Sequence, residues 1–268
     1  MPNSLLPGGS GLPQPEQTPL TPLKRRQFLQ YAGASASVAA LALAGCSKKD
    51  DDNQPITPVT NTEVGSGDAG VLNYVSAVKL VTSAFYTALR EGNYFKGLPT
   101  SNSAEKQILD DLEKHESVHK NYYKSLVGAN STSGLKQLET DFTSLDFNTR
   151  LTAPGAARMG VLNAAMLFED LSVAAVNGSV RFLTNPAALF TLAKIVSVDA
   201  RHAALIRDLV SYNSFVATDV VDVFVPSSTT PGEGDGTGME RLKTPTEVLT
   251  ILNTYLKEGS KITAALLV

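Results

Sequence analysis

Cysteine and histidine are scarce in this chain of 268 residues. The single cysteine, Cys46, cannot form a disulfide within the chain, so a disulfide-stapled fold is excluded. Two of the three histidines, His119 and His202, stand in short motifs of the same form. The search for a functional site therefore narrows to these two motifs.

An excess of positive charge and a long apolar run are also missing. The 23 basic and 26 acidic residues give a net charge of −3, and loss of an N-terminal signal with Lys24, Arg25, Arg26 and Glu16 changes it to −5. Without a basic stripe or basic residues interleaved with aromatics, nucleic acid is not an expected partner. No run after Cys46 is long enough to cross a bilayer, so we expect membrane attachment only through a lipid.

The N-terminal region has the pattern of an export signal. Arg25 and Arg26 begin a twin-arginine pattern, and a small, apolar run follows from residue 32 to 44. The run ends in Leu43-Ala44-Gly45-Cys46, which resembles the lipobox of bacterial lipoproteins, in which cysteine is acylated after cleavage. The expectation is a signal peptide over residues 1–46 and a protein lipid-anchored in a bacterial cell envelope.

Residues 47–67 are predicted to be a flexible tether, because they contain almost no apolar side chains that could offset the entropy lost on ordering. The run Lys48-Lys49-Asp50-Asp51-Asp52 resembles the surface-export signals of some lipoproteins, and a merely solvated tether is the alternative. Both the periplasmic and the cell-surface side of the envelope therefore remain open.

The two histidine motifs are Glu116-Ser-Val-His119 and Asp199-Ala-Arg-His202. A carboxylate and an imidazole three residues apart lie on one face of a helix, so each pair can bind a single cation. In four-helix bundles that hold two metal ions, two helices contribute such pairs, and the other two each contribute a lone carboxylate.

One lone carboxylate is present and the other is replaced. Glu169 lies on the apolar stripe of a predicted helix, six residues after the motif Val161-Leu162-Asn163. The same motif recurs at residues 71–73, and six residues after it stands Lys79. The chain therefore consists of two similar helix hairpins in which an ammonium replaces one of six expected ligands.

Periodicity and capping residues predict an all-α fold. Four long helices are expected at about residues 68–91, 104–128, 154–182 and 187–211. The weakly patterned stretch 129–151, with a short helix near 134–142, would be the long crossover of a four-helix bundle over residues 68–213. Residues 214–268 would form a loop, with a Val-rich segment at 220–225, and a last helix from Thr246 that packs on the bundle.

The motifs of this chain resemble those of the ferritin-like superfamily, most closely those of the ferritin-like domain family that includes plant desiccation-related proteins. The resemblance spans about residues 68–213 and implies a ferritin-like four-helix bundle with a metal centre. Two departures stand out: Lys79 where the family has Glu, and Asp199, which is shorter than Glu. The matching residues are Leu72-Asn73-Tyr74, Phe85-Tyr86, Glu116, His119, Phe168-Glu169-Asp170, Val173-Ala174-Ala175, Asn177-Gly178 and Asp199 to Ala204.

Three carboxylates and two imidazoles suit iron or manganese, as one ion or two. Because Lys79 stands at the sixth ligand position, three states of the site are possible. Lys79 can displace one ion by pairing with Glu169 or Glu116, it can form a metal-free ionic network with the carboxylates, or it can lose its proton and stay neutral. The two motifs can also be ordinary buried hydrogen-bonded pairs.

Other polar residues receive less specific interpretations. His115 is expected on the surface, away from the site. Tyr86 and Tyr123 are expected to be core residues with satisfied hydroxyl groups, and a redox-active phenol near a metal is the alternative. Asn73 and Asn163 are expected to make hydrogen bonds at helix ends or between helices.

Two functions remain for an envelope lipoprotein of this kind. One is iron or manganese binding or redox chemistry at a partly degenerate di-metal carboxylate site. The other is a metal-free structural or stress-protection module that kept only the fold. Iron storage in a closed cage fits poorly with a lipid anchor and a tether. Substrate and protein partners are not specified by the sequence, and a homodimer remains open.

Overall fold

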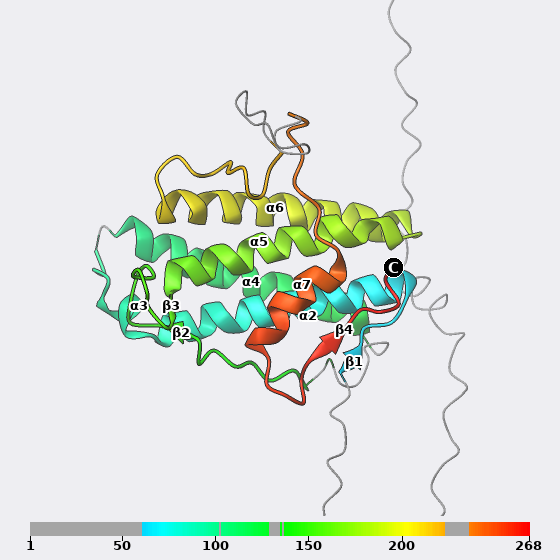
Figure 1. Cartoon of the computed structure of the whole chain (residues 1–268), viewed down its shortest axis with the longest axis horizontal. Coiled ribbons are helices and arrows are strands. Elements are labelled where there is room, and N and C mark those ends of the chain that lie inside the picture. Colours follow the sequence, from blue (N-terminus) through cyan, green and yellow to red (C-terminus); the bar gives the residue numbers. More distant parts are fainter. Residues whose placement is uncertain (1–60, 102, 129–134, 136, 223–235) are drawn as a thin grey trace, which may run out of the picture. The chain divides into compact units, whose positions relative to one another are not determined.

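The computed structural model describes residues 61–101, 103–128, 135, 137–222 and 236–268. All of these residues belong to one compact unit, residues 51–268. The predicted export signal with Arg25, Arg26 and Cys46 lies outside the described residues, as does most of the predicted tether. The described part is a four-helix bundle with a few two-residue strands, which agrees with the all-α bundle that the sequence predicted (Figure 1).

The first hairpin consists of α2 (Gly67–Glu91) and α4 (Ala104–Val127), joined through the short α3 (Asn93–Gly97). Ser103 caps α4 by accepting a hydrogen bond from Lys106 N at 3.2 Å. Gly128, with a φ of 52°, ends α4 in a conformation that favours glycine. The predicted bounds of both long helices are confirmed to within a residue.

The second hairpin consists of α5 (Val161–Ser179), extended by the 3-10 turn η3 (Val180–Phe182), and α6 (Pro186–Val210). Asn185 caps α6, and Pro186 occupies the first turn, where its missing N–H costs nothing. The predicted start of the third helix at Pro154 is wrong. Residues 153–158 are not helical, because the chain first forms the strand β3 (Met159–Gly160) before α5 begins.

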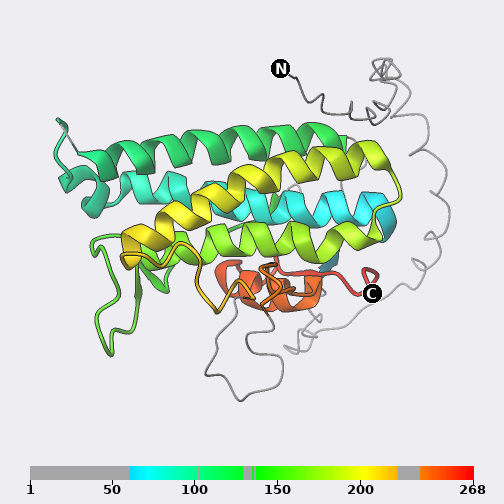
Figure 2. The ribbon, with the colours of Figure 1, turned by 90° about the horizontal axis from the view of Figure 1, so that it is seen from above.

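A long crossover joins the hairpins. It returns the chain along the bundle, so that α5 runs in the same direction as α4, as predicted (Figures 1 and 2). Strand β2 (Leu145–Asp146) pairs in parallel with β3 near the start of α5. Residues 138–142 are not helical, so the short helix predicted near 134–142 does not form over these residues.

The C-terminal segment packs on the bundle. Helix α7 (Pro245–Leu252) begins with a capping box between Thr244 and Glu247 and contacts α2 and α5. Of the predicted Val-rich segment 220–225, the described part ends at residue 222, and Val221 bridges Glu240.

The predicted tether ends earlier than expected. Strand β1 (Thr62–Glu63) pairs in parallel with β4 (Ile262–Thr263), and the Val64 side chain is completely buried. The prediction that the tether extends to residue 67 is therefore wrong for residues 62–66. Strand β4 pairs with this segment, and the local composition does not reveal that partner. Among the described residues, no helix is both long and apolar enough to cross a membrane.

Candidate metal centre

The six side chains singled out in the sequence converge in the middle of the bundle. Lys79 comes from α2, Glu116 and His119 from α4, Glu169 from α5, and Asp199 and His202 from α6. Each long helix thus contributes at least one group. The exposed fraction is 2% or less for Lys79 and the three carboxylates and 6% for His202, so the cluster lies inside the core.

Lys79 contacts two carboxylates of the cluster. Its Nζ donates hydrogen bonds to Glu116 Oε1 at 2.9 Å and to Oε2 at 2.8 Å. It also lies 2.9 Å from Asp199 Oδ1. Pairing with Glu116 was one of the predicted alternatives, whereas the direct contact with Asp199 was not predicted and no ion pair with Glu169 forms.

Burial by itself would lower the pKa of Lys79, but the carboxylates of Glu116, Asp199 and Glu169 outweigh burial and raise this pKa. Without an ion, the ammonium form of Lys79 is therefore favoured, and a neutral Lys79 beside a bound cation stays a prediction. Burial also opposes ionisation of Glu116, yet Lys79 and the two imidazoles hold the pKa of Glu116 well below its usual range. The pair is thus an ammonium and a carboxylate.

The imidazoles face the same carboxylates through their Nδ1 atoms. His119 Nδ1 lies 3.2 Å from Asp199 Oδ1 and 3.4 Å from Glu116 Oε1. His202 Nδ1 lies 3.4 Å from Glu116 Oε1 and 3.5 Å from Glu169 Oε2. Although burial alone would lower the pKa of His202, Glu116 and Glu169 raise it to about 9. Glu116 is therefore shared by both imidazoles.

The potential ligand atoms form two groups of three. Glu116, His119 and Asp199 form one group, and Glu116, Glu169 and His202 form the other, with the ligand atoms of each within 4.8 Å of one another. Several of these atoms have no hydrogen-bond partner among the described residues: His119 Nδ1, His202 Nδ1, Glu169 Oε2 and both Asp199 oxygens. Buried polar atoms without partners are costly, and a cation would satisfy them. The donor set and these atoms fit a metal ion.

Comparison with known families identifies the family of the bundle that holds this centre. The ferritin-like domain family matches residues 67–212, which is more than half of the chain. The chain belongs to the ferritin-like domain family. No curated protein matches it.

In this ferritin-like domain the two tyrosines beside the centre differ from one another. Tyr86 donates a 2.7 Å hydrogen bond to Glu169 Oε1, as expected of a core tyrosine with a satisfied hydroxyl. The Tyr123 hydroxyl is equally buried but has no hydrogen-bond partner among the described residues, which differs from the expectation. Tyr86 therefore holds one oxygen of Glu169 and leaves Oε2 facing His202.

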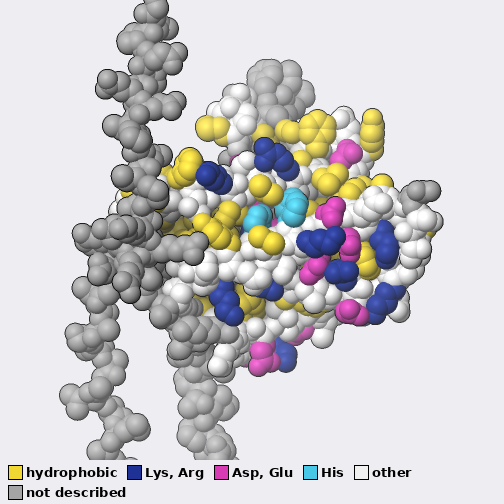
Figure 3. Space-filling view, turned by 180° about the vertical axis from the view of Figure 1, so that it is seen from behind, with side chains coloured by type: hydrophobic (Ala, Val, Ile, Leu, Met, Phe, Trp, Pro, Cys, Tyr) yellow, Lys and Arg dark blue, Asp and Glu magenta, His cyan; other side chains and the backbone are white. Residues whose placement is uncertain are grey.

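His115 was placed wrongly by the sequence interpretation. It is exposed, as predicted, but its Nδ1 lies 3.0 Å from His202 Nε2, so it touches the centre. A helical wheel of α4 alone turns His115 away from Glu116, and the wheel cannot show that His202 on α6 reaches it. Histidine side chains are visible on this face of the molecule, surrounded by apolar and charged side chains (Figure 3).

The two asparagines lie outside the centre. Asn73 donates to Val64 O at 3.0 Å, and Asn163 Oδ1 accepts from Thr152 N at 2.8 Å. Both contacts join a helix to the segment that precedes it. The expectation of structural hydrogen bonds at helix ends is confirmed.

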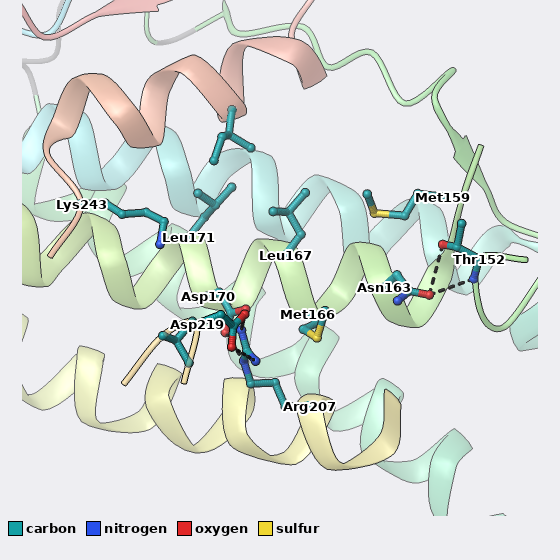
Figure 4. Close-up of a pocket in the computed structure, with 12 residues that line it drawn as sticks. Thr152, Met159, Asn163, Met166, Leu167, Asp170, Leu171, Arg207, Asp219 and Lys243 are labelled. Atoms are coloured by element: carbon teal, nitrogen blue, oxygen red, sulfur yellow. Dashed lines mark hydrogen bonds and ion pairs between the residues drawn. The ribbon is translucent and has the colours of Figure 1, made fainter. Parts of the chain in front are cut away.

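A second buried charged group lies on the other side of α5. The Arg207 guanidinium donates two hydrogen bonds to Asp170, at 2.7 and 3.0 Å, and two to Asp219, at 2.9 and 3.1 Å. These residues line one wall of a largely apolar cavity of about 370 Å³ that Met166, Leu167 and other side chains complete (Figure 4). We refer to Arg207, Asp170 and Asp219 as the arginine cluster.

Proposed function

We propose that this ferritin-like domain binds one divalent iron or manganese ion through Glu116, Glu169 and His202, in a lipoprotein of the bacterial cell envelope. The observation that carries the proposal is the division of the centre into two groups that share Glu116. Lys79 contacts two of the three residues in the group with His119, and only Glu116 in the group with His202. The second group therefore keeps two members, Glu169 and His202, that Lys79 does not contact, and an ion bound there would share Glu116 with the ammonium.

Formal charge also favours a single ion. The centre holds three carboxylates and one ammonium, which leaves a net charge of −2 before the imidazoles are counted. One divalent cation neutralises that charge, whereas a second would leave an uncompensated positive charge in a buried site, where charge is expensive. The Lys79 ammonium in effect replaces the second ion.

The protein groups around the proposed ion have distinct tasks. Glu116 and His202 come from opposite hairpins, so an ion bound by both would join the two halves of the bundle. Tyr86 fixes Glu169 so that Oε2 remains available. A bound iron or manganese ion would supply redox or Lewis-acid chemistry that the side chains lack.

The envelope location is part of the proposal and is supported by the sequence pattern at Arg25, Arg26 and Cys46. Fifteen residues separate Cys46 from Thr62, where β1 begins, so an acylated Cys46 would keep the start of β1 within about 55 Å of the lipid. Substitution Cys46→Ala should move the protein from the membrane fraction to the soluble fraction. Lipid labelling that persists in this variant would contradict the lipid anchor.

A second candidate is a metal-free structural module. Its specific support is the Lys79–Glu116 pair, which makes two short hydrogen bonds inside the core and can stabilise the bundle without an ion. Under this alternative, the ancestral metal site has become an ionic network, and the domain acts through its surface.

Metal analysis of the full-length protein, purified without chelators, separates the two candidates. We expect about one iron or manganese ion per chain in the wild type and none in Glu169→Gln. Lys79→Glu restores the missing carboxylate and should raise the content toward two ions. A wild type without metal that also takes up none on addition of Fe²⁺ or Mn²⁺ would leave the metal-free module.

A further inference from the structure

We propose that His115 is a positioning residue that accepts a hydrogen bond from Nε2–H of His202 and thereby keeps Nδ1 of His202 directed at the metal ion. This inference rests on the proposed function and assigns a role to a residue outside the two carboxylate-histidine motifs. His115 lies on α4, one residue before Glu116, and its ring is exposed to solvent.

The geometry of the two rings supports a hydrogen bond in the plane of both. The atoms His115 Nδ1 and His202 Nε2 are 3.0 Å apart, and the ring centroids are 5.2 Å apart with an interplanar angle of 23°. A centroid separation this much larger than the nitrogen contact means that the rings meet edge to edge, with the two nitrogens facing. Such an in-plane contact between a donor and an acceptor is a directed hydrogen bond.

This contact determines which nitrogen of His202 is available for an ion. A neutral imidazole carries one proton, and the nitrogen without it is the ligand. His202 Nδ1 faces Glu116 and Glu169, so the proton has to reside on Nε2 when an ion is bound. His115 supplies the acceptor that stabilises this tautomer, and it also fixes the ring orientation.

The other imidazole of the centre lacks a comparable partner. No described residue hydrogen-bonds the second ring nitrogen of His119, whose group contains the residues that Lys79 contacts. Among the described residues, an orienting partner is thus present for His202, in the group with Glu169, and not for His119. This difference between His202 and His119 supports the single-ion arrangement, and the contact that shows it does not involve Lys79.

The test compares four full-length proteins: the wild type, His115→Leu, His115→Gln and the matched control Asn121→Leu. Leu removes the acceptor, whereas the Gln side-chain oxygen can accept from His202 Nε2–H. Asn121 is an exposed neutral residue on the same helix, six residues from His115. Circular dichroism shows whether all four proteins fold alike.

We expect His115→Leu to weaken Mn²⁺ and Co²⁺ binding by about 10- to 100-fold, the range for loss of a group that orients a ligating histidine. His115→Gln should recover most of the affinity, and Asn121→Leu should bind like the wild type. In the Co²⁺-loaded protein, NMR should show a slowly exchanging imidazole N–H in the wild type and in His115→Gln, and its loss in His115→Leu.

Two outcomes overturn the inference in distinguishable ways. If the wild type binds neither Mn²⁺ nor Co²⁺, the proposed function fails and the positioning role fails with it. If the wild type binds and His115→Leu retains both its affinity and the protected N–H signal, the metal site stands and only the role of His115 is wrong.

Discussion

The candidate metal centre and the arginine cluster both consist of carboxylates around one buried basic side chain, and they differ in how many carboxylate oxygens have a hydrogen-bond partner. In the arginine cluster, each of the four carboxylate oxygens of Asp170 and Asp219 accepts a hydrogen bond from Arg207. In the candidate centre, Glu169 Oε2 and Asp199 Oδ2 lack hydrogen-bond partners among the described residues, whereas Asp199 Oδ1 lies 2.9 Å from the Lys79 ammonium.

This difference separates a structural cluster from a candidate site. A planar guanidinium pairs with two carboxylates at once, so the arginine cluster is complete without any further group. An ammonium is a compact charge, and Lys79 cannot satisfy three carboxylates that surround it from different helices. The unused ligand atoms of the centre are therefore available to a cation, which is what distinguishes its chemistry from that of the arginine cluster.

The largest effect is expected for Lys79→Met. Removing the ammonium leaves Glu116 and Asp199 as buried carboxylates without a balancing lysine, and breaking a buried ion pair costs about 3–5 kcal/mol in the free energy of unfolding. If the centre accepts cations, added Mn²⁺ should recover most of this loss. Denaturant unfolding of the variant with and without Mn²⁺ measures both quantities.

Two results would change this interpretation of Lys79. A loss of stability that Mn²⁺ does not recover would make the centre a structural network, like the arginine cluster. A variant that is as stable as the wild type with and without metal would mean that the Lys79–Glu116 pair contributes nothing, which contradicts the argument from burial.

Arg207→Met provides the matched comparison and should cost less, about 2–3 kcal/mol. Arg207 is 4% exposed, but the Asp219 side chain is 67% exposed and can be solvated when its partner is lost. The same unfolding experiment should show no recovery with Mn²⁺. Recovery equal to that of Lys79→Met would break the distinction between the two clusters, since both would then accept a cation.

The variant Tyr86→Phe tests how the hydrogen bond from Tyr86 affects Glu169 in the candidate centre. The variant leaves Glu169 Oε1 without its hydrogen bond, and an unpaired buried acceptor costs about 1–2 kcal/mol in the metal-free protein. With Mn²⁺ bound, Glu169 can turn both oxygens toward the ion, so the difference from the wild type should shrink. A difference that grows on adding Mn²⁺ would show that Tyr86 is needed to orient the ligand.

Much of the bundle could be predicted from the sequence because its signals are local. Ser103 and Asn185 cap the starts of α4 and α6. The apolar stripe that follows each cap predicts the helix. The start of α5 could not be predicted, because Pro154 is compatible with a first helical turn and yet lies before the β2–β3 contact. The β2–β3 contact depends on residues 145 and 146. The backbone of Leu151 also approaches Gly160 so closely that a Cβ on residue 160 would lie 2.5 Å from it, and this too is a tertiary contact.

For the candidate site, too, one part could be predicted from local sequence signals and another part depends on tertiary packing. The spacing of Glu116 with His119 and of Asp199 with His202, together with the repeat that relates Glu169 to Lys79, was sufficient to predict that the six side chains meet. The choice of Asp199 as the second partner of Lys79 and the contact between His115 and His202 depend on how α4 and α6 pack. Neither can be derived from one helix at a time.

The smallest effect concerns Glu240, which lies beside the arginine cluster and tests whether that cluster responds to pH through a neighbour. Burial, and then the charge of Asp170, raise the pKa of Glu240 to about 7 from its ordinary 4.5. The folded protein therefore retains this proton to a higher pH than the unfolded chain, so the contribution of Glu240 to stability falls as pH rises from about 4.5 to 7 and is constant above.

Glu240→Gln removes this titration and keeps an amide beside Asn177, which hydrogen-bonds Glu240 at 3.1 Å. Because Glu240 is only partly buried, we expect the variant to gain about 1 kcal/mol relative to the wild type between pH 5 and 8. Urea unfolding of both proteins at several pH values measures the difference. A constant difference over this range would mean that Glu240 titrates alike in the folded and unfolded chains, and that the arginine cluster leaves its neighbour's charge unaffected.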